Sequence, residues 1–185
     1  MKTVSQYPVN TIKQAMVGGK AVHGTFAVLG EPALVEMIGY AGLDYVIIDT
    51  EHSGNTTEQA GNLIRAAEIG NITSIMRVTA NTPELILRAL DMGAGGILVP
   101  QVNTAGQAIA AVKAARYAPS GERGIAGVVR AARYGFVPMQ EYIAGANRET
   151  LVITQVEHVD SVSNLDEILA VDGIDGGNLL GCDAL

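Results

Sequence analysis

Residues 44–52 read Asp-Tyr-Val-Ile-Ile-Asp-Thr-Glu-His, an apolar run that ends abruptly in two acids and a histidine. Such a run between polar residues is typical of a short strand that is covered on both faces, as in a parallel sheet. Ligands of parallel α/β folds bind outside the carboxyl ends of the strands. The polar residues 49–52 are therefore a candidate site, provided that other strands end in matching chemistry.

The composition restricts the class of protein. The chain has 185 residues, of which 48% are hydrophobic, and its net charge is −7. This is enough for one buried core, so we expect a single domain over residues 1–185. The 12 Lys and Arg residues are scattered, which disfavours a nucleic-acid partner. A single cysteine and the lack of a long apolar run predict a cytoplasmic protein without membrane association.

The chain alternates between segments with strand character and segments with helix character. The predicted strands are residues 21–29, 45–49, 72–78, 95–102, 151–157 and 173–180. The predicted helices are residues 11–16, 32–41, 57–69, 83–92, 104–117, 138–147 and 162–170. Residues 118–135 interrupt this rhythm with a long, glycine-punctuated, basic loop, which is typical of a functional or a disordered segment.

Repeated strand–helix units predict a parallel sheet with right-handed crossovers. A (β/α)₈ TIM barrel takes about 250 residues, so six units predict an α/β barrel that is truncated before its last quarter. A doubly wound sheet is the alternative, but it needs a glycine-rich phosphate loop after the first strand. Residues 30–33 read Gly-Glu-Pro-Ala and lack that loop. Because an open sheet leaves two unpaired edges, we expect this sequence to be a fragment.

Several predicted strands end in residues that suit one reaction. Glu157 and Asp183 follow the last two strands, and two such carboxylates can share a hard divalent cation. Arg77 ends the third strand and can bind a carboxylate or an oxyanion, whereas His52 can exchange protons near neutral pH. Taken alone, His52 is more often a polar strand end, Arg77 a surface ion-pair partner, and each of the two acids a solvated strand end. Their joint position on one rim favours enolate chemistry on a 2-oxo acid.

Asp91 is a different kind of candidate. It lies in the last turn of a predicted helix, where the helix dipole disfavours an anion. The simple interpretation is a solvated acid. If Asp91 is functional, its place on the opposite rim predicts contact with His52 of another subunit, so that the site would form at an interface.

Five stretches make the chain resemble the HpcH/HpaI aldolase family of metal-dependent class II pyruvate aldolases, which includes 4-hydroxy-2-oxoheptanedioate and 2-dehydro-3-deoxyglucarate aldolases. They are AGLDYVIIDTEH (41–52), MRV (76–78), LDMGAGGILVPQV (90–102), ARYAPSGERG (115–124) and VITQVEH (152–158). The resemblance implies a (β/α)₈ barrel, usually hexameric, that cleaves or forms a carbon–carbon bond between pyruvate and an aldehyde. It also implies a divalent cofactor, Mg²⁺, Mn²⁺ or Co²⁺.

The resemblance assigns roles to individual residues. Glu157 and Asp183 would bind the metal, Arg77 would hold the pyruvate enolate, and His52, supported by Asp91, would handle the proton. The remaining matches are Asp49 as an acid near the base, and Gln155, Cys182 and Asp183 as contacts of the oxo acid. Glu51 is expected to be an orienting or a solvated neighbour. The chain departs from the family at its sixth strand end, where residues 178–185 read Asn-Leu-Leu-Gly-Cys-Asp-Ala-Leu.

Two other functions remain open. The first is decarboxylation of oxaloacetate followed by bond formation, as in the related macrophomate synthase. The second is a non-catalytic barrel fragment. The aldehyde pocket is expected to draw on Arg123, Gly124 and the later strands.

Overall fold

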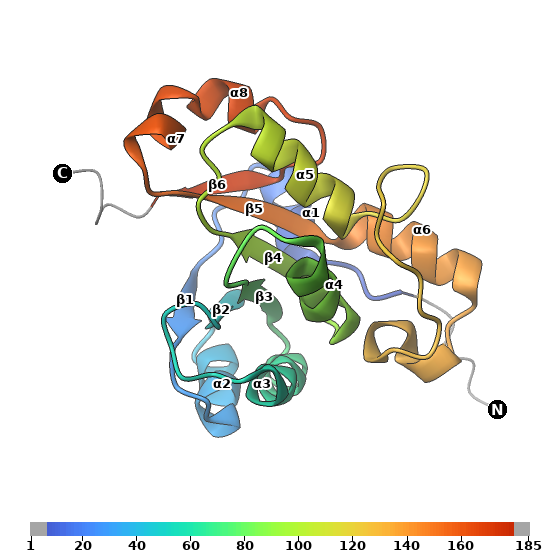
Figure 1. Cartoon of the computed structure of the whole chain (residues 1–185). Helices are drawn as coiled ribbons and strands as arrows, with labels where there is room; N and C mark the ends of the chain where they lie inside the picture. The colour runs from blue at the N-terminus through green and yellow to red at the C-terminus, as the bar shows by residue number, and fades with distance from the viewer. Residues whose placement is uncertain (1–6, 180–185) are drawn as a thin grey trace.

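The computed structural model describes residues 7–179 and contains a parallel sheet curled into part of a barrel, with helices on its outer face (Figure 1). The strands are β1 (Gly24–Ala27), β2 (Tyr45–Asp49), β3 (Thr73–Arg77), β4 (Gly96–Val99), β5 (Leu151–Val156) and β6 (Gly176–Leu179). The helices are α1 (Thr11–Val17), α2 (Pro32–Tyr40), α3 (Thr57–Ile69), α4 (Pro83–Asp91), α5 (Ala105–Ala115), η1 (Arg130–Gly135), α6 (Met139–Glu149), α7 (Val159–Ser163) and α8 (Leu165–Leu169).

The strand order is strictly sequential, β1-β2-β3-β4-β5-β6, and every pair is parallel. A doubly wound sheet would reverse its order at an internal switch point, so this alternative is wrong. Among the described residues, β1 and β6 each have a partner on one side only. The observed architecture is thus a curled six-stranded α/β half-barrel.

Alternation along the strands produces two apolar layers. The larger layer lies between the sheet and the outer helices and includes Val46, Ile48, Leu63 and Ile97. A smaller layer lies on the concave side, where Ile47, Ile75 and Leu98 pack with Ile12 of α1. Because successive side chains of a strand point to opposite faces, the residues two positions after Ile47 and Ile75 also point into the barrel. Those residues are Asp49 and Arg77.

Helix α1 covers the end of the half-barrel at which the strands begin. Asn10 caps this helix and donates hydrogen bonds from its Nδ2 to the carbonyl oxygens of Gly95 and Glu149, at 2.8 and 3.0 Å. Its backbone N–H donates to Glu149 Oε2 at 2.9 Å. Helix α1 is therefore fixed at the amino ends of the strands, and the carboxyl ends of the strands form the opposite rim.

The predicted element boundaries need small corrections. Strand β1 covers only residues 24–27 instead of 21–29, because the exposed Val28 and Leu29 lead into a bend. The helix predicted over residues 162–170 is two short helices that meet at Asn164, whose Nδ2 donates to the carbonyl oxygen of Asn103. The loop of residues 118–135 is ordered and ends in η1, in which Arg133 and Tyr134 have left-handed φ values of 51° and 56°.

Candidate active site

The polar rim begins with the pair Asp49 and Arg77, which are register partners on β2 and β3. Arg77 donates from Nε to Asp49 Oδ1 at 2.9 Å and from Nη2 to Asp49 Oδ2 at 2.7 Å. Its Nη1 donates to Gln155 Oε1 on β5 at 3.2 Å. The guanidinium also lies over the ring of Phe26, with its carbon 5.0 Å from the centroid, which is cation–π distance. Three strands and an aromatic ring thus fix one buried cation.

Asp49 shapes the backbone turn that follows β2. Its Oδ1 accepts from the backbone N–H groups of Glu51 and His52, at 3.0 and 3.2 Å. Burial favours the neutral acid, but the hydrogen bonds from Arg77 and from these two N–H groups outweigh it and lower the pKa of Asp49. An ionised Asp49 therefore both holds Arg77 and sets the direction of the next two side chains.

Glu51 and His52 leave this turn in different environments. The Glu51 side chain is 13% exposed, and its Oε2 lies 3.5 Å from Arg77 Nε and 3.7 Å from His52 Nε2. Burial raises the pKa of Glu51, and the charges of Glu157 and Asp49 add to the increase against the opposing effect of Arg77 and His52. The His52 side chain is 70% exposed. The imidazole therefore stands at the open surface with a carboxylate beside it.

A second chain of contacts leads from Arg77 to Glu157. Gln155 is fully buried, and its Nε2 donates a short hydrogen bond to Glu157 Oε2. Glu157 Oε1 accepts from the backbone N–H of Gln101 at 2.8 Å. Gln101 has a left-handed φ of 55°, a conformation that costs a non-glycine residue about 1 kcal/mol or more. Strained backbone of this kind gathers at functional sites.

The donor chemistry of this rim suits a hard divalent cation. Three carboxylates, Asp49, Glu51 and Glu157, stand against one guanidinium, so the negative charge is in excess, and oxygen is the ligand that Mg²⁺ and Mn²⁺ prefer. Within residues 7–179, however, no three His, Cys, Asp or Glu side chains are grouped as metal ligands. The described part of the chain thus supplies Glu157 of the predicted ligand pair. Asp183 and Cys182 lie outside the described residues.

Asp91 lies away from this rim. It ends α4 and therefore sits near the beginning of β4, at the other end of the half-barrel. Its Oδ1 accepts from Arg123 Nη2 at 2.7 Å, and Arg123 also contacts the Tyr142 hydroxyl and lies over the Tyr117 ring. The structure does not bring Asp91 and His52 of one chain together. Arg123 is buried beside Asp91, away from the rim of its own chain. Its expected part in the aldehyde pocket stays a prediction.

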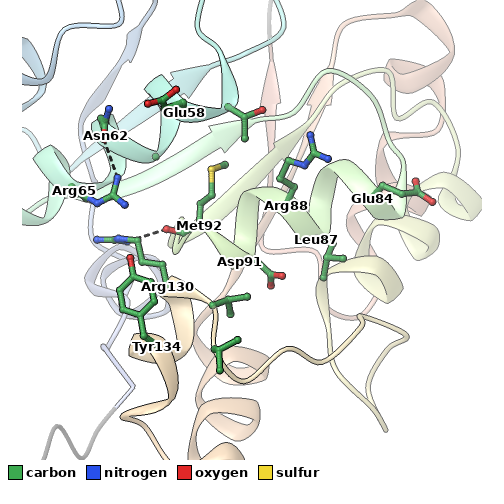
Figure 2. A pocket seen from close by; sticks show the side chains of 14 residues that line it. Glu58, Asn62, Arg65, Glu84, Leu87, Arg88, Asp91, Met92, Arg130 and Tyr134 are labelled. Atoms are coloured by element: carbon green, nitrogen blue, oxygen red, sulfur yellow. Dashed lines mark hydrogen bonds between the residues drawn. The ribbon is translucent and has the colours of Figure 1, made fainter.

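A groove of about 880 Å³ lies on the outside of the half-barrel. It is bordered by α3, α4 and residues 128–134, and Figure 2 shows Arg65 and Met92 facing Arg130 across it. Arg130 is held there by Glu68 and by the Met92 carbonyl oxygen. We place the candidate site at the strand ends and not in this groove, because the buried ionised network converges at the strand ends.

Sequence reasoning missed two contributors to the rim and left the role of a third undecided. Gln101 acts through a backbone N–H, which no side-chain pattern reveals. Phe26 was counted only as a strand residue, although its position near the end of β1 could have indicated an aromatic wall. Glu51 was left as an orienting or a solvated neighbour, and its burial became visible only in three dimensions.

A parallel βα half-barrel with a polar rim at its strand ends defines an enzyme-like scaffold, and comparison with known proteins identifies the family. The chain belongs to the HpcH/HpaI aldolase/citrate lyase family, whose pattern matches residues 23–183. Over 91% of its length, it is 38% identical to a hydroxypyruvate/pyruvate aldolase of Roseobacter denitrificans, of which it covers 66%. Over 92% of its length, it is 40% identical to a 4-hydroxy-2-oxovalerate aldolase of Novosphingobium aromaticivorans, of which it covers 64%.

Solved structures agree with this assignment. A HpcH/HpaI aldolase/citrate lyase family protein from Burkholderia cenocepacia superposes with a TM-score of 0.86 at 33% identity, covering 92% of this chain and 68% of the other. The chain spans about two thirds of the length of the relatives that it matches. The described residues contain no helix that is long and apolar enough to cross a membrane.

Proposed function

We propose that this chain forms the larger part of a class II pyruvate aldolase, which cleaves a 4-hydroxy-2-oxo acid into pyruvate and an aldehyde or joins the two. The observation that carries the proposal is the fixed guanidinium of Arg77. Three of its five N–H groups are engaged by Asp49 and Gln155, which leaves two donors for a ligand. A planar pair of donors suits the carboxylate or the enolate oxygen of a bound 2-oxo acid.

The neighbouring residues would divide the remaining tasks. Gln155 is held between Arg77 and Glu157, so it can orient both toward the same bound acid. His52 is exposed beside them and can accept the proton of the 4-hydroxyl group as the C3–C4 bond breaks. Arg77 stabilises the negative charge that develops on the enolate oxygen. Lysine is not needed in this scheme, and Lys20 and Lys113 lie away from the strand ends.

A divalent cation, Mg²⁺, Mn²⁺ or Co²⁺, is part of the proposal. Glu157 and Asp183 would hold it, and when bound it would supply Lewis-acid stabilisation of the enolate. The excess of carboxylates around Arg77 supports this choice, because a cation would offset the repulsion between Glu51 and Glu157 that contributes to the raised pKa of Glu51.

The proposal extends to the complete barrel and to its oligomer. Two further βα units beyond this sequence would pair with the edges of β1 and β6 and complete a (β/α)₈ barrel. The complete protein would be a cytoplasmic homo-oligomer, a hexamer as the family resemblance implies, in which Asp91 of one subunit reaches His52 of another.

The direct test follows the enolate without an aldehyde. The chain is incubated with pyruvate and Mn²⁺ in deuterium oxide, and loss of the methyl proton signal is followed by NMR. We expect exchange that Arg77→Lys reduces at least about 100-fold, whereas Arg88→Lys, at an exposed arginine of α4, leaves it unchanged. Absence of exchange in the wild-type chain would instead favour the non-catalytic fragment.

Decarboxylation of oxaloacetate, the rival reaction, is distinguished from the aldol reaction by its product. Oxaloacetate is supplied in place of pyruvate plus an aldehyde, and the carbon dioxide released is measured against the aldol product. Rapid decarboxylation together with no aldol product from pyruvate would overturn the aldolase proposal in favour of a macrophomate synthase-like activity.

A further inference from the structure

Glu51 is a buried carboxylate to which the described structure gives no hydrogen bond. Its Oε2 is inaccessible to solvent, and no donor within residues 7–179 contacts it. A buried acceptor that is left unpaired destabilises the folded chain. Buried polar groups are nearly always paired, so this exception requires an explanation.

The turn after β2 forces Glu51 into this position. The backbone N–H groups of Glu51 and His52 both donate to Asp49 Oδ1, and the hydroxyl groups of Thr50 and Ser53 donate to the carbonyl oxygens of Arg77 and Asp49, both at 2.6 Å. Asn55 Nδ2 adds a bond to the Asp49 carbonyl oxygen at 2.9 Å. The backbone of residues 49–53 is therefore held at several points, which fixes the position from which the Glu51 side chain leaves the turn.

Among the charged groups of residues 7–179, only His52 is free to pair with Glu51. Arg77 Nε lies 3.5 Å away, but its one hydrogen already goes to Asp49. Asp49 on its own strand and Glu157 after β5 are both acids and repel it. His52 Nε2 lies 3.7 Å away on a ring that is mostly exposed, so a small rotation brings this nitrogen within hydrogen-bond distance.

We propose that Glu51 is the positioning residue of His52. Its Oε2 accepts the Nε2–H of the imidazole, which leaves Nδ1 as the nitrogen that takes a proton. The inference rests on the proposed function, in which His52 is the base. Glu51 does not itself become protonated in this step. The proton moves from the substrate hydroxyl group to Nδ1, and the carboxylate stabilises the imidazolium that results.

The pairing can be tested without turnover by chemical labelling. Diethyl pyrocarbonate modifies the neutral imidazole, and the three histidines of the chain, His23, His52 and His158, are separated by peptide mass spectrometry. Glu51→Gln should raise the labelling rate of His52 about two- to threefold, because a neutral side chain of equal size no longer holds Nε2 in a charge-assisted hydrogen bond. His23 and His158 serve as internal standards.

Two further variants test whether the change in His52 labelling is specific to the Glu51 carboxylate. Glu58→Gln removes one exposed acid from the nearby start of α3 and should leave the His52 rate unchanged, whereas Glu51→Asp should retain part of the wild-type protection. The difference between wild type and Glu51→Gln should shrink in about 1 M salt, because screening weakens charge interactions. Circular dichroism confirms that each variant is folded.

The outcomes separate this inference from the proposed function. If the chain exchanges pyruvate protons but Glu51→Gln labels like wild type, the positioning role is wrong and the aldolase proposal stands. If labelling changes as expected but no exchange occurs, the Glu51–His52 pair exists and the aldolase proposal fails. In an active enzyme, Glu51→Gln should also lower kcat with little change in KM, because a positioning residue of the base acts on the chemical step. Asp91→Asn altering His52 labelling while Glu51→Gln does not would assign the support to Asp91.

Discussion

Asp49 and Arg77 face each other across β2 and β3 and are joined through two parallel hydrogen bonds of 2.9 and 2.7 Å. Both side chains are almost completely buried. A buried pair of this kind is not in itself a large source of stability, but removal of one partner leaves an uncompensated charge. The pair is therefore a sensitive point for both the fold and the site.

The free energy of unfolding should depend on the Asp49–Arg77 pair in acidic solution. Since the pKa of Asp49 is lowered from its ordinary value of 3.8, its stabilising contribution is fully present above that value and is lost as the pH falls through the folded-state pKa. Asp49→Asn should reduce the free energy of unfolding by about 3 kcal/mol at neutral pH. The deficit should narrow toward about pH 2, as measured by urea unfolding. An equal deficit at all pH values would contradict the assignment.

His52→Ala should separate activity from stability. The ring is 70% exposed, so its removal should change the free energy of unfolding by less than about 0.5 kcal/mol. Turnover of a 4-hydroxy-2-oxo acid should fall by about 10² to 10⁴, the usual effect of losing a general base. His23→Ala, at another exposed histidine, is the matched control. Full activity of His52→Ala would refute the role of this residue.

Asp91 should have a structural effect that is separable from any catalytic one. Its partner Arg123 is 1% exposed at the side chain, and Asp91→Asn would leave that cation poorly compensated, at a cost of about 3 kcal/mol. A double variant, Asp91→Leu with Arg123→Met, should recover part of the stability. If activity stays low in this stable double variant, the predicted catalytic role across subunits gains support. If activity returns, Asp91 serves the fold alone.

Chelation tests the cofactor. Addition of EDTA should abolish pyruvate proton exchange, and Mg²⁺, Mn²⁺ or Co²⁺ should restore it. Glu157→Gln should weaken Mn²⁺ binding at least about 10-fold when measured by calorimetry. Thr154→Val changes a neighbouring buried residue of β5 and should leave Mn²⁺ affinity unchanged. Exchange that is indifferent to EDTA would rule out the class II reaction.

Much of the fold could be predicted because its signals are local. The apolar run of residues 45–48 predicted a parallel strand, and the helix predicted over residues 57–69 matches α3, which Thr56 begins with a capping box to Gln59. Strand ends were placed less well, because Val28 and Leu29 are β-formers that the folded chain leaves exposed. Closure into eight units is a property of residues beyond those described, so it stays a prediction.

The sequence could predict that certain strand-end residues meet at the rim, but not which of them form hydrogen bonds with one another. Alternation places Asp49, Arg77 and Gln155 on one face, so their convergence follows from strand register. The direction of the turn after β2 decides that Asp49 binds Arg77 with both oxygens. Asp49 thereby takes the Nε hydrogen of Arg77, which Glu51 would otherwise accept. The position of Arg123 could not be predicted either, because a long loop can return to either end of a barrel and its sequence does not indicate which.

The sequential order of the strands also determines how the rim can be assembled during folding. Each strand pairs only with its neighbours in the chain. The connections are short except between β4, which ends at Val99, and β5, which begins at Leu151, so growth of the sheet one unit at a time is entropically favoured up to β4. Asp49 and Arg77 can meet as soon as β3 adds to β2. Gln155 and Glu157 must wait for β5, so the ion pair can precede the completed pocket and serve as its template.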